Sequence, residues 1–479
     1  MGGEVTMPLS LLKLACRVLN YAVSFVVFSL LDLLDIVLCF VYKIVDYFVE
    51  AEWKPCYCSS AKDMITSNGN ILVSENGGPK VVRLCNTRLQ LEDISDTLYY
   101  RPSRVAEASR KAALATIAPT TSTSLRAPAN GTTTTTTTTT FTINSTIVEV
   151  LRDKMSRRQP QLVPRWSDCD CKTCNGWSSS PSSNLFVHAE GPRDGVSAKE
   201  DVLFIHGFIS SSTFWTETVF PEFTEDTKLS HRLFAVDLLG FGRSPKPAES
   251  LYTLREHVDM IERSVLDKHN VKSFHIVAHS LGSIIALALA VKHPEAVKSL
   301  TLLAPPYFAV PKGEDGAQYI MRTVAPRRVW PPIAFGASMA CWYEHVSRTI
   351  CLLICKNHRV WDFLFKLITR NRMRTFLIEG FMCHTHNAAW HTLHNIICGS
   401  SRKMDSYLDA VRENLSCDVT IFHGRKDELL PAECSYAVGS KIPRARVKVF
   451  ENKDHITLVV GQEKAFAREL EEIWRKASK

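Results

Sequence analysis

Short β-rich runs alternate with longer helical patterns from about residue 200 to the C-terminus, and this alternation constrains the fold most. The predicted strands are 201–206, 234–237, 274–278, 300–303, 419–422 and 447–450. An alanine- and leucine-rich helix is predicted from Gly282 to about Lys292. Such alternation is typical of a mostly parallel sheet flanked by helices. We therefore predict an α/β fold.

The junction between the third strand and that helix reads Ala278-His279-Ser280-Leu281-Gly282. A serine in such a turn has a strained backbone, and the residues two before and two after it must be small because the backbones nearly touch. Alanine replaces the first glycine of the G-x-S-x-G pattern, but it adds only a methyl group. The pattern predicts Ser280 as a nucleophile. The alternative is an ordinary helix N-cap.

Two further residues follow later strands in a suitable order. Asp427 comes just after the fifth predicted strand, and His455 follows the last one. Serine, acid and histidine in this order are typical of the α/β-hydrolase fold, in which histidine takes the serine proton and the acid orients the imidazole. Glu428 is an adjacent rival for the acid, whereas Asp418 precedes its strand and is expected at the wrong end.

A tetrahedral acyl intermediate needs preorganised donors for its negative oxygen. The N–H of Leu281, just after the nucleophile, is one predicted donor, and the N–H of Phe208, after the first strand, is the second. His206 is an auxiliary candidate, although we favour a structural histidine that anchors this turn. This chemistry requires no cofactor and no metal.

Residues 306–417 exceed what the sheet needs and are predicted to form a helical lid. Its aromatic side chains favour a lipid or acyl-ester substrate, although lid helices also need apolar faces to pack. Four histidines have spacings that zinc also uses, but we favour packing or capping roles for them. They are His384, His386, His391 and His394.

The charge of the chain bears on its binding partners, and its cysteine content bears on disulfides and metal binding. The net charge is +8, from 57 basic and 49 acidic residues, but no Lys/Arg block indicates nucleic-acid binding. Of the 15 cysteines, Cys56 with Cys58 and the run Cys169, Cys171 and Cys174 are tightly spaced. Only the last two have a Cys-x-x-Cys form, so we favour disulfides over metal there.

Residues 1–50 form an apolar segment with sparse charges. At about 100° per residue, its charges fall within an arc of about 120°, so a continuous helix has a polar stripe. The uncharged window from Val18 to Leu31 is short for a membrane span of about 20 residues. A cleaved secretory signal and a retained membrane anchor both remain open, and a core helix of a soluble domain is the third alternative.

Residues 51–165 contain a flexible linker with nine consecutive threonines, Thr132 to Thr140. N-glycosylation patterns begin at Asn130, Asn144 and Asn414, which agrees with a secretory route. The catalytic domain is expected over residues 166–479.

From about Asp168 onward, and in its N-terminal segment, the chain resembles the BODYGUARD-type plant α/β-hydrolases. The resemblance rests on residues 202–212, 237–244, 278–282 and 423–427, combined with the cysteine-rich run and the apolar N-terminus. It implies a lysophospholipase that acts outside the cytoplasm of epidermal cells in cuticle formation, and that associates with the cell membrane and cell wall. The threonine run is not part of the family pattern.

We therefore predict a serine esterase for lipid or cutin-type acyl esters. Two alternatives remain. An extracellular acyltransferase would pass the acyl group to a polymer hydroxyl, and a non-catalytic ligand-binding homologue would keep the fold without the reaction. The oligomeric state is left open.

Overall fold

The computed structural model describes residues 9–50, 70–75, 78–83, 95–99, 184–192, 198–247, 250–368, 370 and 375–477. They divide into two compact units, one containing the N-terminal helix and residues 327–346, the other containing the sheet. The clustered cysteines at 56–58 and 169–174, the threonine run, and the patterns at Asn130 and Asn144 lie outside the described residues.

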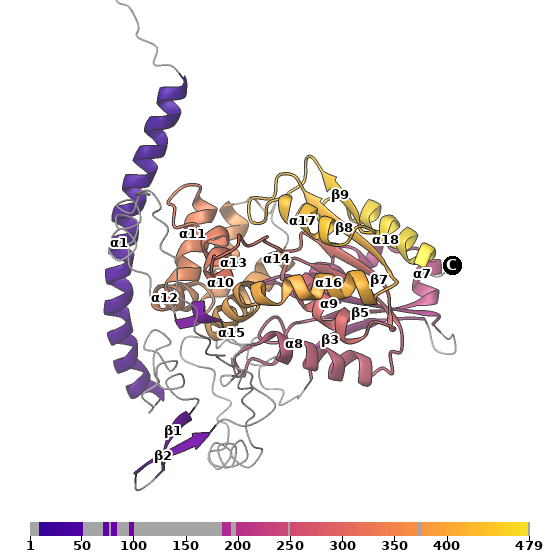
Figure 1. The fold of residues 1–479 in the computed structure, drawn as a ribbon, viewed down its shortest axis with the longest axis horizontal. Coiled ribbons are helices and arrows are strands. Elements are labelled where there is room, and N and C mark those ends of the chain that lie inside the picture. Colours follow the sequence, from indigo (N-terminus) through magenta and orange to yellow (C-terminus); the bar gives the residue numbers. More distant parts are fainter. Residues whose placement is uncertain are drawn as a thin grey trace, which may run out of the picture. The chain divides into compact units, whose positions relative to one another are not determined.

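A seven-stranded sheet forms the centre of the second unit (Figure 1). Its strand order is β3-β5-β4-β6-β7-β8-β9. The strands are β3 (Val187–Glu190), β4 (Glu200–Ile205), β5 (His231–Val236), β6 (Phe274–His279), β7 (Val297–Leu303), β8 (Asp418–Gly424) and β9 (Arg446–Phe450). All neighbours pair in parallel except β3 with β5. The predicted α/β fold is confirmed, and β3 is an additional edge strand.

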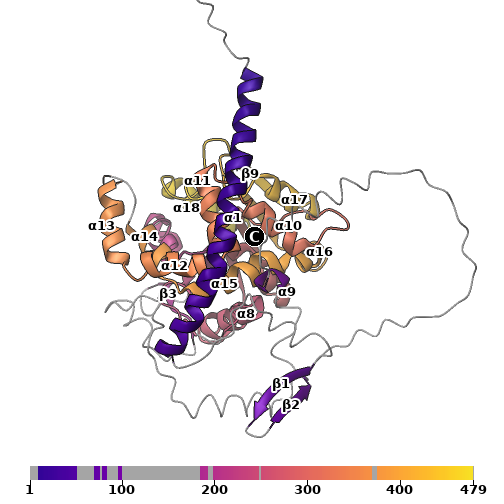
Figure 2. The ribbon, with the colours of Figure 1, turned by 90° about the vertical axis from the view of Figure 1, so that its left-hand side faces the viewer.

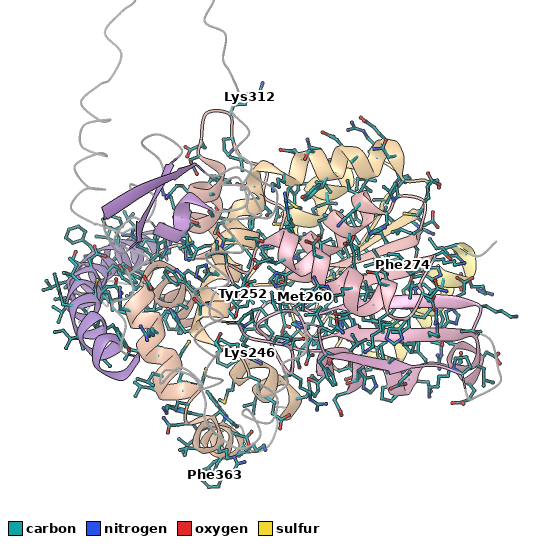
Figure 3. The ribbon with its side chains drawn as sticks, turned by 90° about the horizontal axis from the view of Figure 1, so that it is seen from below. Lys246, Tyr252, Met260, Phe274, Lys312 and Phe363 are labelled. Atoms are coloured by element: carbon teal, nitrogen blue, oxygen red, sulfur yellow. The ribbon has the colours of Figure 1, made fainter. Side chains whose placement is uncertain are left out.

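Both faces of the sheet are buried, which explains why its strands are apolar at consecutive positions. On β4, Leu203 and Ile205 belong to one core cluster, whereas Val202 and Phe204 belong to the other. The helices α8 (Leu254–Ile261), α9 (Leu281–Lys292) and α16 (Met404–Asn414) cover the first face. On the second face lies α18 (Glu463–Ala477), whose Trp474 contacts Phe204. Figure 3 shows Phe274 of β6 and Met260 of α8 in the unit that contains the seven-stranded sheet.

The chain between β7 and β8 is helical in its described part. It contains α10 (Gly316–Val324), α11 (Pro332–Trp342), α12 (Glu344–Ile354), α13 (His358–Ile368), α14 (Thr375–Met382) and α15 (His386–Thr392) before α16. The predicted lid range of 306–417 includes α16, which packs on α9 and covers the sheet.

The other unit contains α1 (Leu9–Glu50), the antiparallel pair β1 (Asn70–Glu75) and β2 (Gly78–Arg83), and α11. Residues 14–42 of α1 are long and apolar enough to cross a membrane, by length and composition. Two acids of the polar stripe of α1, Asp32 and Asp35, face a segment of the same chain. Asp32 accepts a hydrogen bond from Tyr343 Oη at 2.6 Å, and buried Asp35 accepts the N–H groups of His345 and Val346 at 2.9 and 3.2 Å.

Candidate active site

Ser280 lies on a strained turn between β6 and α9. Its backbone has φ 52° and ψ −123°, a sparsely populated conformation for a residue with a side chain. The Ser280 N–H donates to Leu303 O at 2.7 Å, which ties the turn to β7. A Cβ on Gly282 would lie 2.6 Å from His206 O, so this position has no room for a side chain. Ala278, by contrast, is fully buried with its methyl group in the core.

Asp427 and His455 meet at the edge of the sheet formed by the carboxyl ends of the strands, where Ser280 also lies. His455 Nδ1 lies 2.6 Å from Asp427 Oδ2. The other carboxylate oxygen, Oδ1, accepts the N–H groups of Leu429 and Leu430 at 2.9 and 2.8 Å. Since Nδ1 donates to the carboxylate, the Nε2 of a neutral His455 carries the lone pair.

The rival acids lie elsewhere. Glu428 is exposed to solvent. Asp418 begins β8 at the opposite edge of the sheet and pairs with Arg446 at 2.6 Å. Of the three carboxylates, Asp427 is the one that the structure places against His455.

Asp427 remains ionised although its side chain is completely buried. Burial alone raises its pKa, but hydrogen bonds from His423 and His455 hold the pKa of Asp427 below its ordinary value. His423 is itself fixed, because its Nε2 lies 2.8 Å from Leu430 O and its Nδ1 lies 2.6 Å from Ser435 Oγ. The sequence motifs predict no role for His423. Its place as the penultimate residue of β8 is a signal that could have found it.

His279 connects the Ser280 turn to the His455 loop. Its Nε2 lies 3.0 Å from His455 O, and its ring stacks on Phe214. Burial and the neighbouring His455 lower the pKa of His279 to about 3, so it stays neutral. The loops after β8 and β9 also touch directly, since a Cβ on Gly424 would lie 2.4 Å from Lys453 O.

The predicted oxyanion donors flank Ser280. Leu281 is the first residue of α9, where backbone N–H groups have no acceptor within the helix. The turn that carries Phe208 touches the serine, because a Cβ on Gly207 would lie 3.1 Å from Ser280 Cβ. Within the described part of the chain, the Phe208 N–H donates to no backbone acceptor.

Both ring nitrogens of His206 contact the backbone. Its Nδ1 lies 2.7 Å from Gly207 O, and its Nε2 accepts the Leu238 N–H at 2.9 Å. Burial lowers the pKa of His206 to about 4. Asp237 holds the same region from the other side by accepting the N–H groups of Ser212 and Arg243. These contacts indicate that His206 shapes the turn after β4.

The four histidines of the predicted lid do not converge on one point. His394 Nδ1 lies 3.0 Å from Thr97 Oγ1, whereas His384 Nε2 faces two cysteines, Cys351 and Cys355. Sequence spacing alone did not pair His384 with cysteines about 30 residues earlier.

Comparison with known proteins agrees with this architecture. Residues 202–462 match the family model of the alpha/beta hydrolase fold, so the chain is an α/β-hydrolase by class. Two relatives from Arabidopsis thaliana match over nearly the full length. Probable lysophospholipase BODYGUARD 3 is 60% identical and Probable lysophospholipase BODYGUARD 1 is 55% identical, each over 96% of this chain and 97% of its own length. The chain belongs to the BODYGUARD family, as the sequence motifs predicted.

One solved structure to which the chain is similar is the esterase EaEST from Exiguobacterium antarcticum. It is 17% identical, the match covers 62% of this chain and 96% of that chain, and the TM-score is 0.43.

Proposed function

We propose that this chain is a serine hydrolase of lipid acyl esters, with Ser280 as nucleophile, His455 as base and Asp427 as the orienting acid. The observation that carries the proposal is the 2.6 Å contact between His455 Nδ1 and the buried carboxylate of Asp427, at the sheet edge where Ser280 occupies its strained turn.

In the proposed reaction, Ser280 Oγ attacks the acyl carbonyl and His455 Nε2 takes its proton. The N–H groups of Phe208 and Leu281 bind the oxyanion. One such donor lowers the activation free energy by about 3 to 4 kcal/mol. His455 returns the proton to the leaving alcohol. Water then attacks the acyl-enzyme, again through His455, and releases the fatty acid.

The lipid substrate class has two supports. The relatives at 60% and 55% identity carry the name probable lysophospholipase, and we extend that substrate class to this chain. The chain also presents apolar surface. On α13, Val360, Phe363 and Leu367 follow one helical face and are exposed, and Figures 2 and 3 show this helix and Phe363 at the outer edge. Amphipathic helices with an exposed apolar face are one class of segment that lies on lipid surfaces.

We also propose that α1 is retained as a membrane anchor and that the catalytic unit lies outside the cytoplasm, where it acts in cuticle formation. The support for retention is the set of hydrogen bonds that Tyr343, His345 and Val346 donate to Asp32 and Asp35 of α1. Cleavage of α1 would leave these polar groups without their acceptors. Intact mass of the mature protein tests this point, and loss of residues 1–50 would refute it.

The catalytic proposal is tested with a fluorophosphonate probe, which labels activated serines. We expect the wild type to be labelled and Ser280→Ala to lose the label. The matched control is Ser283→Ala, one helical turn further along α9 and fully buried, which should keep the label. An unlabelled wild type would refute the activated serine, and a labelled Ser280→Ala would reject the nucleophile.

The acyl acceptor and the membrane contact are tested with product analysis. A lysophospholipid offered with a long-chain alcohol should yield free fatty acid, whereas a fatty ester would favour the acyltransferase alternative. Phe363→Ser should lower the rate on vesicle-borne lipid and leave hydrolysis of a soluble ester unchanged. Leu229→Ser, an exposed leucine before β5, is the control.

A further inference from the structure

Two cysteines and a histidine converge beside the candidate active site. Cys351 lies on α12 and Cys355 lies one helical turn later, while His384 follows α14. His384 Nε2 is 3.8 Å from Cys351 Sγ and 3.9 Å from Cys355 Sγ. The three ligand atoms lie within 4.8 Å of one another. Cys355 and His384 are buried, so the cluster is largely shielded from solvent.

The orientation of His384 is fixed in the manner of a metal ligand. Its Nδ1 donates to the backbone carbonyl of Phe381 at 2.7 Å. This hydrogen bond places the proton on Nδ1 and leaves the lone pair of Nε2 facing the two sulfur atoms. A carbonyl that holds the remote ring nitrogen is the usual support of a metal-binding histidine.

The spacing of the cluster is close to that of a zinc site. With Zn–S near 2.3 Å and Zn–N near 2.0 Å, tetrahedral ligands lie about 3.6 Å apart for S···N and about 3.8 Å apart for S···S. The observed S···N distances exceed this value by only a few tenths of an ångström.

His386 lies beside this three-residue group and is the fourth ligand in the set argued below. It is 7% exposed, it contacts Cys351, and its Nε2 is buried without a hydrogen-bond partner among the described residues. Ser347 Oγ lies 3.5 Å from its Nδ1, which is too long for a strong hydrogen bond. A buried imidazole nitrogen without a partner is costly, and coordination would remove that cost.

We propose that Cys351, Cys355, His384 and His386 bind one Zn²⁺ ion in a closed structural site. Two thiolates and two imidazoles form a ligand set that suits zinc, and binding releases the two thiol protons. The ion ties the end of α12 to His384 after α14 and to His386, the first residue of α15.

The site adjoins the wall of the candidate oxyanion hole. His384 pairs with Phe241 through an isolated β-bridge, and the Phe241 ring lies 6.0 Å from the ring of Phe208. Zinc bound by these four residues holds the segment from α12 to α15 against the loop that carries Phe241. The metal-binding proposal stands independently of the hydrolase proposal, because neither the nucleophile nor its base is a ligand.

The test begins with zinc content and cobalt replacement. Full-length protein in detergent, purified without chelator, should contain about one zinc per chain by elemental mass spectrometry. After chelation, Co²⁺ should give the strong visible bands of tetrahedral coordination and a near-ultraviolet thiolate-to-metal charge-transfer band. Wild-type protein that holds no stoichiometric zinc and gives no such bands would overturn the proposal. So would a Cys351–Cys355 disulfide in the mature protein.

Variants then assign the ligands. Cys351→Ser with Cys355→Ser should abolish binding, and Cys417→Ser, a buried cysteine outside the cluster, should leave it unchanged. Cys355→His keeps a ligand at that position, so it should retain the metal while the charge-transfer absorbance falls about twofold with the loss of one of two Co–S bonds. An unchanged spectrum would reject Cys355 as a ligand. Fluorophosphonate labelling at Ser280 separates failure of this proposal from failure of the hydrolase.

Discussion

His455 Nδ1 and Asp427 Oδ2 lie 2.6 Å apart, and the side chain of Asp427 has no exposure to solvent. Two backbone N–H groups hold the other carboxylate oxygen, so the acid cannot turn away from the imidazole. In the proposed mechanism, this pair leaves Nε2 of His455 as the nitrogen that acts as the base.

Asp427→Asn should lower kcat for ester hydrolysis by about 10²- to 10⁴-fold with little change in KM, because the amide no longer stabilises the productive imidazole tautomer. The measurement is steady-state kinetics with a soluble ester. Glu428→Gln, next along the chain and exposed, should change kcat by less than about threefold. Equal losses in the two variants would contradict the assignment of the acid.

Gly282→Ala should lower the free energy of unfolding by about 1 to 3 kcal/mol, because the new methyl group would meet His206 O at 2.6 Å. Its activity should fall as well, since the turn before Phe208 must shift. Chemical denaturation measures the first effect. Gly336→Ala in α11 is the control, because a Cβ there meets nothing within 4 Å. Alanine should be neutral or slightly stabilising there. If Gly282→Ala had the free energy of unfolding of the wild type, the backbone near His206 O would have moved aside without cost.

Asp35→Ala should expose the backbone of residues 345–346 to faster hydrogen exchange, because each buried N–H that loses its acceptor costs about 1 to 3 kcal/mol. Exchange of a peptide covering residues 327–346 is measured by mass spectrometry. Leu34→Ala, a neighbouring exposed position of α1, should exchange like the wild type. If mature protein with Asp35→Ala exchanges like the wild type, α1 does not hold this segment.

Acidification should destabilise the sheet-containing unit. Burial lowers the pKa of His206 to about 4 and that of His279 to about 3, against 6.5 for an ordinary histidine. Between pH 6.5 and about 4, the unfolded chain therefore binds protons that the folded chain does not. The free energy of unfolding falls as pH falls, by up to about 1.4 kcal/mol per pH unit for each histidine, and the full stability is present above pH 6.5.

The measurement for this pH dependence is the denaturation midpoint between pH 4 and 7. His279→Gln should show a shallower decline than the wild type by about one proton. Parallel curves for wild type and His279→Gln would contradict the prediction.

The central sheet was predictable because its strands are buried on both faces and therefore stand out as apolar runs. The edge strand β3 was not, since its residues are half-buried or exposed and carry no such signal. The Ser280 turn was predictable for a local reason, because the small residues and the strained serine lie within five positions of the chain.

Sequence alone determined the class of fold, the nucleophile candidate and the order in which its partners follow, because these depend on local periodicity and on a steric requirement at one turn. Only the tertiary structure decided the contacts between distant segments. It placed Asp427 and not Glu428 against His455, joined Asp35 to residues 345–346, and brought His384 to Cys351 and Cys355. The physical reason is that each of these contacts joins polar side chains from segments that only tertiary packing brings together, and sequence spacing carries no record of that packing.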